Sequence, residues 1–126
     1  MERIVDLDAV AGEIERRRGG WAAAGLQVGA ITWRDEAAQW PQPLETDRCR
    51  VRDPDSVGVH IVGVQSAEAE VVIFRGGWAD VGFFSECTGW EAVLENPKAR
   101  SSSEFGAVLD AVVARAFGSG SAAVPA

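Results

Sequence analysis

Three short apolar runs, separated by turn-forming residues, dominate the middle of the chain. Residues 57–65, 70–75 and 78–85 are rich in Val, Ile and aromatic side chains, which favour β-strands. Residues 66–69 separate the first two runs, and Gly76-Gly77 separates the last two. Both central residues of a type I′ turn have positive φ, which glycine adopts without steric cost, so the glycine pair predicts a two-residue hairpin. The pattern predicts an antiparallel β-meander.

Before the meander, apolar residues recur at helical spacing over residues 5–24. Asp6 or Asp8 can act as the N-cap of this helix, and Gly25 predicts its C-terminal end. The pair Gly19-Gly20 interrupts the pattern, because glycine is a poor helix former. The sequence therefore predicts a helix that is kinked, or ends in a separate turn, near the glycine pair.

After the meander, apolar residues again recur every three or four positions, which predicts a second helix over residues 103–117. Ser102 or Ser103 can accept its first free amide hydrogens, and Gly118 predicts its end. Residues 118–126 are small and mostly uncharged, and they predict a flexible tail.

Two further segments have strand composition. Residues 26–33 predict a strand that follows the first helix, and residues 90–94 predict a short strand after the meander. Residues 34–47 contain two prolines and several polar side chains, which predicts a loop.

Arginines alternate with small apolar residues in a short run after this loop. Arg48, Arg50 and Arg52 recur with a period of two, which predicts a strand with three cations on one face. Charge on an edge strand hinders unwanted pairing, so a protected edge is one interpretation. A contact with an anion or a carboxylate is the other.

The order of elements is thus helix, five or six strands, helix. We expect an α+β fold in which an antiparallel meander carries the N-terminal and C-terminal helices on one face, since this arrangement buries both apolar stripes. A length of 126 residues suits one domain, which we assign to residues 1–117.

Net charge limits the kind of partner. The chain has a formal charge of -7 and a pI near 4.6, which disfavours nucleic acids and anionic membranes and suits a basic protein. Residues 66–95 contain Arg75 as their one basic residue and six carboxylates: Glu68, Glu70, Asp80, Glu86, Glu91 and Glu95. These acids either keep a small protein soluble or form a docking face on and beside the meander.

Cysteine usage and hydropathy predict a cytoplasmic protein. No basic stretch precedes an apolar leader, and no apolar window approaches the length of about 20 residues that spans a bilayer. Cys49 and Cys87 are far apart and match no metal motif, so we expect free thiols that pack in the interior. Arginine far outnumbers lysine, a bias typical of GC-rich bacterial genomes.

Catalytic groups are scarce. His60 is the only histidine, and its neighbours suggest a partly buried packing residue rather than a catalyst. Glu68 and Glu70 superficially match the E-x-E pair of ADP-ribosyltransferases, but the serine cluster at residues 101–103 comes after the pair rather than before it. Neither a metal set nor a phosphate-binding glycine motif is present. We therefore expect no enzymatic activity, no metal and no cofactor.

Aromatic residues of the third run indicate a binding surface. Trp78, Asp80 and Phe84 share one face of the predicted strand, and the small and apolar residues between them share the other. If the apolar face forms the core, two aromatic rings flank a carboxylate on the opposite face, as in many interface anchors. The alternative is that helices cover the face with Trp78. Glu86 follows directly, and with the other three it completes the candidate contact set.

Residues 15–28, 60–93 and 104–117 together resemble the small immunity proteins of bacterial polymorphic toxin systems, especially the TriTu-type proteins. Those proteins combine a Trp-x-x-Ala-Gly-like helix end, an aromatic-small-Gly turn followed by an acid, and a closing C-terminal helix. Residues 34–56 have no counterpart in those proteins. The matching positions are Trp21, Ala24, Gly25, Phe74, Gly77, Asp80, Thr88 and Gly89.

This resemblance implies a cytoplasmic protein without activity of its own, which binds a cognate secreted toxin, such as an ADP-ribosyltransferase, one to one and blocks its active site or substrate surface. A different class is an acidic secretion chaperone, which would form a dimer and hold an unfolded segment of an effector. A third class is an enzyme or small-ligand binder that uses His60.

Overall fold

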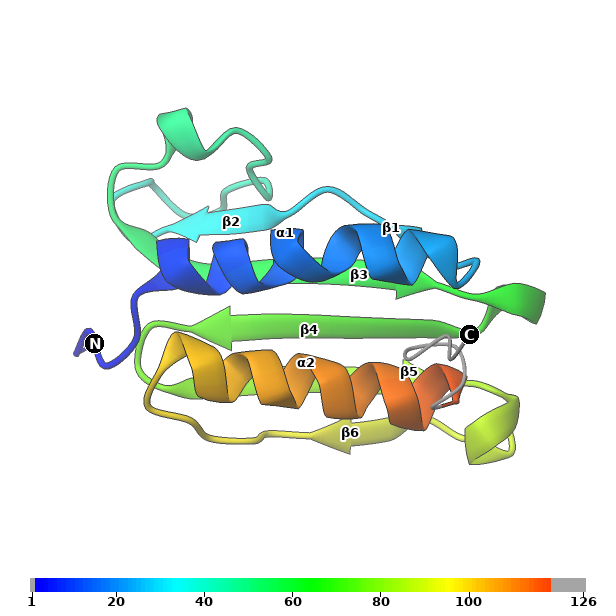
Figure 1. Ribbon diagram of the computed structural model, residues 1–126. Helices are drawn as coiled ribbons and strands as arrows, with labels where there is room; N and C mark the ends of the chain where they lie inside the picture. Colours follow the sequence, from blue (N-terminus) through cyan, green and yellow to red (C-terminus); the bar gives the residue numbers. More distant parts are fainter. Residues whose placement is uncertain (1, 119–126) are drawn as a thin grey trace.

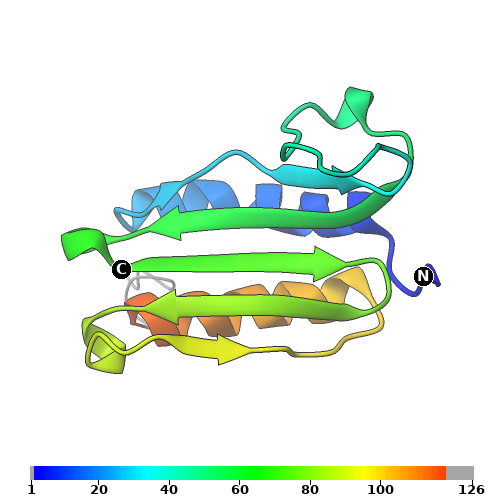
Figure 2. The same cartoon turned by 180° about the vertical axis from the view of Figure 1, so that it is seen from behind.

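Two helices lie side by side on one face of a six-stranded antiparallel sheet (Figure 1). The computed structural model describes residues 2–118, so the predicted tail lies outside the described residues except for Gly118. The predicted α+β fold, with both helices on one face, is confirmed (Figure 2). In chain order the elements are α1 (Leu7–Ala23), β1 (Gln27–Val28), β2 (Thr32–Asp35), η1 (Arg48–Arg50), β3 (Pro54–Val62), η2 (Val64–Ser66), β4 (Glu68–Phe74), β5 (Trp78–Phe84), η3 (Glu86–Thr88), β6 (Val93–Glu95) and α2 (Ser102–Phe117).

Strands β3, β4 and β5 form the predicted meander at the centre of the sheet. The strand order is β1-β3-β4-β5-β6, and β2 pairs with the other half of β3. The segment predicted as one strand over residues 26–33 is therefore two short strands, which both pair with β3 and are separated by residues 29–31. All pairings are antiparallel, and Val59, Val71 and Val81 lie in one cross-strand row.

Helix α1 is continuous through the glycine pair. Asp6 is its N-cap and accepts hydrogen bonds from the amides of Asp8 and Ala9, while Gly25 ends it at φ +91°. The predicted kink is wrong, because Trp21 lies one position after the glycines and is buried with only 3% of its surface exposed. Core packing of this indole outweighs the low helix propensity of the glycines.

Helix α2 packs beside α1 through a small residue and an ion pair. Gly106 allows the close approach, since a Cβ there would lie 2.6 Å from Oε1 of Glu13. Arg17 of α1 donates two hydrogen bonds to Asp110 of α2, at 2.7 and 3.1 Å. The N-cap of α2 is Ser101 rather than the predicted Ser102 or Ser103, and its helix ends at Gly118 as predicted.

The hairpin between β4 and β5 differs from the predicted type I′ turn. Phe74 and Trp78 are register partners, so the connection has three residues, and Gly77 alone has positive φ. The amide of Gly77 donates to the Phe74 carbonyl at 3.0 Å. A three-residue loop with its left-handed residue last is a common hairpin connection. The carbonyl of Arg75, within this loop, accepts hydrogen bonds from the amides of Ile4 and Val5 near the N-terminus.

Residues 36–53 form a long excursion from the sheet, and the carboxylate of Asp35 binds both of its ends. The Asp35 side chain accepts hydrogen bonds from the amides of Ala37, Arg52 and Asp53 at 2.9 to 3.0 Å. These bonds lower the pKa of Asp35, with the Arg52 amide as the largest cause. The predicted arginine strand is wrong, because residues 48–50 form the single 3₁₀ turn η1, capped by Asp47.

The core lies between the helix pair and the sheet. Val10 and Ile14 of α1 and Phe105 and Leu109 of α2 are fully buried against the strands. Full burial of such side chains is worth about 1.5–3 kcal/mol each. The packing leaves the opposite face of the sheet without a helical cover (Figure 2). Within residues 2–118 no helix is both long and apolar enough to cross a membrane.

Candidate protein-binding face

The alternation of β5 decides which side chains face away from the helices. Ala79, Val81 and Phe83 are buried beneath α1 and α2, with exposed fractions of 0 to 3%. Trp78, Asp80 and Phe84 therefore project from the other face, and the alternative in which helices cover them is excluded. We call this other side of the sheet the open face. Its residues, placed by strand register, are Thr32, Arg34, Ser56, Gly58, His60, Val62, Glu68, Glu70, Val72, Phe74, Trp78, Asp80, Gly82, Phe84 and Leu94.

An aromatic pair marks the hairpin end of the open face. Phe74 and Trp78 are cross-strand partners, and their rings stack with centroids 5.0 Å apart and an interplanar angle of 14°. Each is only half-buried, because neither α1 nor α2 reaches this side. Such a pair offers a partner a large, rigid apolar area.

A second aromatic pair lies at the other end of β5. Phe84 and Trp90 have ring centroids 6.1 Å apart and a tilt of 60°. Trp90 belongs to the loop after η3, where its amide donates to the Ser85 carbonyl at 2.8 Å, and 43% of its surface is exposed. A capping box of Ser85 and Thr88 fixes η3 and thereby the position of this loop.

Carboxylates occupy the space between the aromatic pairs. Glu70 lies between His60 and Gly82 in one cross-strand row, and both Glu70 and Asp80 are exposed. Asp80 accepts a hydrogen bond of 2.6 Å from the Asn96 amide. The centre of the open face is therefore acidic and its two ends are aromatic.

His60 lies on the open face and is exposed, so its prediction as a packing residue is wrong. Its Nε2 is 3.6 Å from Oε2 of Glu68, which forms an ion pair when the imidazole is protonated. Cys49 and Cys87 are both exposed free thiols, which also contradicts their predicted interior packing. Among residues 2–118 no group of three or more His, Cys, Asp or Glu side chains is arranged to hold a metal ion.

Edge strand β6 adds a further apolar side chain to the open face. Arg115 of α2 donates hydrogen bonds of 2.6 and 2.8 Å to the Glu95 carboxylate, which lowers the pKa of that carboxyl. This contact holds Glu95 on the helix side, so Leu94 projects over Gly82 from the open side. With 81% of its surface exposed, Leu94 is among the most exposed large apolar residues of the described chain.

The four predicted contact residues do not all lie together. The structure places Trp78, Asp80 and Phe84 on the open face, whereas Glu86 lies in η3 at the end of the sheet, beside the loop that carries Trp90. The sequence analysis did not include three further aromatic or apolar residues on or beside the open face among the candidate contacts: Phe74, Trp90 and Leu94. Strand parity could have found Phe74, since it is the hairpin partner of Trp78, but the place of Trp90 depends on a loop.

Among known proteins, no family model, no curated sequence and no solved structure matches this chain.

Proposed function

We propose that this protein binds a basic protein partner through the open face and performs no chemistry of its own. One observation carries the proposal: an uncovered sheet face on which two aromatic pairs flank exposed carboxylates. Monomeric proteins rarely expose large contiguous apolar areas unless another molecule covers them. Aromatic anchors supply most of the binding energy in many interfaces, and their partners are often charged in a complementary sense.

The charges on the open face favour a basic partner. Glu70 and Asp80 are exposed, and His60 lies in the cross-strand row of Glu70. Arg34, on the β2 side of this face, lies over the Trp40 ring. Together with the net charge of -7, these carboxylates attract a cationic surface over several ångströms. Such steering raises the association rate, while the aromatic rings lengthen the lifetime of the complex.

We further propose that the partner is a secreted bacterial toxin and that this protein is its cytoplasmic immunity protein, as the resemblance to TriTu-type immunity proteins implies. Blocking the active site or substrate surface of an ADP-ribosyltransferase needs only a rigid complementary surface. An open face built on a continuous six-stranded sheet provides such rigidity, because the central strands are fixed by hydrogen bonds on both sides.

Co-expression tests the immunity proposal. A candidate toxin domain, sought among the genes next to the one for this protein, is expressed in a bacterial host with and without this protein, and growth is measured. We expect rescue of growth and a one-to-one complex on size-exclusion chromatography. A stable dimer of this protein bound to an extended effector segment, without rescue, would instead identify a secretion chaperone.

A further inference from the structure

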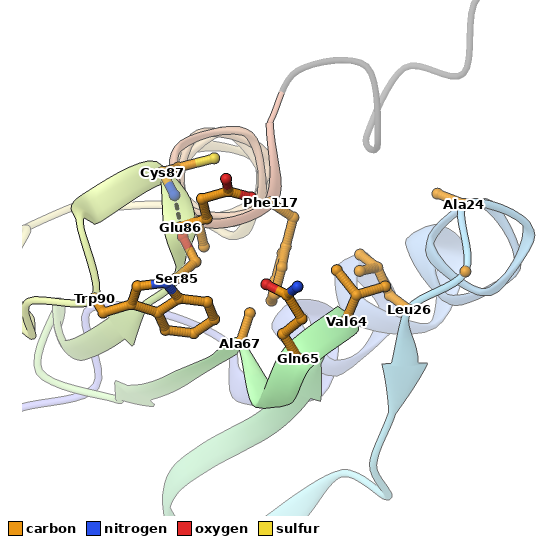
Figure 3. A pocket seen from close by; sticks show the side chains of 12 residues that line it. Ala24, Leu26, Val64, Gln65, Ala67, Ser85, Glu86, Cys87, Trp90 and Phe117 are labelled. Carbon is orange, nitrogen blue, oxygen red and sulfur yellow. Dashed lines mark hydrogen bonds between the residues drawn. The ribbon is translucent and has the colours of Figure 1, made fainter.

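A pocket opens at the end of the sheet where both helices finish. It has a volume of about 150 Å³ and lies between the last residues of α1 and α2 and the loops around η2 and η3 (Figure 3). Trp90 lies on one side and Val64 and Leu26 on the other, with Gln65 and Phe117 between them (Figure 3). The walls are thus mostly apolar, and Val64 and Trp90 at the rim are 79% and 43% exposed.

The pocket has a defined floor. Phe117, at the end of α2, lies directly on the backbone of Gly63, since a Cβ added at that glycine would be 2.8 Å from the ring. Glycine at position 63 is therefore required for the ring to lie where it does. The floor joins the last turn of α2 to the end of β3.

Backbone strain gathers around the same pocket. Gln65, Ser66 and Trp90 have φ values of +56°, +64° and +62°, and they are the non-glycine residues with positive φ within residues 2–118. Gln65 and Trp90 line the pocket. Residues other than glycine rarely adopt this conformation, and strain of this kind concentrates at functional sites.

The electrostatic character of the pocket is negative. Glu86 contributes a carboxylate to its wall, and among residues 2–118 no lysine or arginine lines it. The ends of both helices, at Ala24 and Phe117, also line it, and the C-terminal end of a helix favours a cation. Helix α1 has no basic residue in its last turn. The last turn of α2 contains Arg115, but this side chain binds Glu95 and does not line the pocket.

We infer that this pocket binds a cationic group on an aliphatic stem, the side chain of an arginine or lysine of the protein partner. The apolar walls suit the stem, and the Trp90 ring and the Glu86 carboxylate suit the charged end. Continuity with the open face supports a protein source, since Trp90 contacts Phe84 of that face. For this source of the cation, the inference rests on the proposed function.

The cationic group can be tested without the partner. Butylguanidinium is titrated into the full-length protein and followed by two-dimensional amide NMR, with neutral butylurea as the matched isostere. We expect saturable shifts at Ala24, Gln65 and the Trp90 indole, a dissociation constant on the order of millimolar for so small a ligand, and weaker binding of the urea. Equal binding of both compounds, or absence of saturation, would overturn the inference.

Variants assign the charge to one residue. Glu86→Gln should weaken butylguanidinium about two- to fivefold, as expected for a partly exposed carboxylate, and leave butylurea unchanged. Glu91→Gln is the matched control, because Glu91 is an exposed neighbour that does not line the pocket. An equal effect of both substitutions would contradict a role for Glu86.

A second variant tests the pocket without changing the η3 loop, in case Glu86→Gln disturbs the folding of that loop. Gly63→Ala should displace the Phe117 ring and weaken both compounds, with the amide spectrum of the sheet retained. Unchanged binding in this variant would overturn the site. Since neither titration contains the partner, loss of toxin binding in open-face variants and loss of butylguanidinium binding are independent results, and each proposal can fail alone.

Discussion

The indole of Trp78 stacks on the ring of Phe74, 5.0 Å away, on the side of the sheet that lies opposite both helices. The stack stabilises the β4–β5 hairpin, but its outer surface remains available to another molecule. A core aromatic would be covered by a helix. This pair instead gives the open face its largest rigid apolar element, which makes it the first target for mutation.

Replacing Trp78 with alanine should weaken partner binding and leave the protein folded. Loss of a central aromatic anchor costs about 2 kcal/mol or more, which corresponds to about a 30-fold increase in Kd. The loss of the aromatic pair itself costs the fold about 0.5–1.5 kcal/mol beyond the lost area. Calorimetric titration with the toxin domain measures the first effect and urea denaturation the second. An unchanged Kd would move the interface away from the hairpin.

Replacing Glu70 with glutamine should act on the association rate. The carboxylate is exposed on the open face, so its removal weakens long-range attraction and leaves short-range packing intact. We expect a several-fold lower association rate constant at low salt, little change in the dissociation rate, and a smaller effect at high salt. Surface plasmon resonance at two ionic strengths measures all three quantities.

The same substitution on a helix provides the matched control. Glu15 lies on α1, on the other side of the sheet, and pairs with Arg18 in an exposed ion pair of small energetic value. Glu15→Gln changes the net charge by the same amount as Glu70→Gln. If both variants slow association equally, net charge rather than the open face governs encounter.

Asp35→Asn should release the excursion of residues 36–53. A neutral amide replaces a carboxylate that accepts three backbone hydrogen bonds, so we expect a lower free energy of unfolding by about 1–3 kcal/mol at neutral pH. Because the pKa of Asp35 is lowered in the folded state, its contribution is present above the unfolded value and is lost as the pH falls through the folded value. The wild-type protein should therefore lose this increment in acid and the variant should not.

Urea denaturation at neutral pH and at pH values below the ordinary aspartate range measures this difference. Convergence of the two stabilities in acid is the expected result. A gap between wild type and variant that stays constant across the pH range would show that the Asp35 charge does not stabilise the fold.

Glycines in α1 and in the hairpin should respond to alanine in opposite directions. A Cβ at Gly20 meets no atom within 4 Å, so Gly20→Ala should stabilise the protein by about 0.5–1 kcal/mol through helix propensity. At Gly77 the φ is +94° and a Cβ would lie 2.9 Å from the Ala99 carbonyl oxygen, so Gly77→Ala should destabilise the protein. Thermal unfolding of the two variants tests both signs.

Periodicity was sufficient for the main elements because each depends on one buried stripe. The two helices and the three meander strands follow from the spacing of residues such as Ile14, Leu109 and Val71, which are all buried. Alternation also placed Trp78, Asp80 and Phe84 on a common face. What it could not decide was which face the helices cover, and that depends on packing between segments far apart in the chain.

Local sequence patterns gave wrong predictions where contacts with other parts of the chain, or the orientation of one side chain, decide the structure. The alternating arginines at residues 48–52 suggest a strand, but hydrogen bonds from backbone amides to Asp35 and Asp47 hold this segment in a turn. His60 has buried neighbours, yet the period of two that buries them turns His60 itself to the open face. The pocket beside Trp90 could not be predicted, because its walls come from four separate parts of the chain.

Calorimetric titration of the toxin domain with a Trp78→Ala, Asp80→Asn, Phe84→Ala triple variant tests the role of the open face most directly. We expect one-to-one binding by the wild-type protein and by Glu15→Gln. The triple variant should show no measurable binding, while its two-dimensional NMR spectrum shows a folded sheet. Binding by the folded triple variant with wild-type affinity would show that the open face is not the interface.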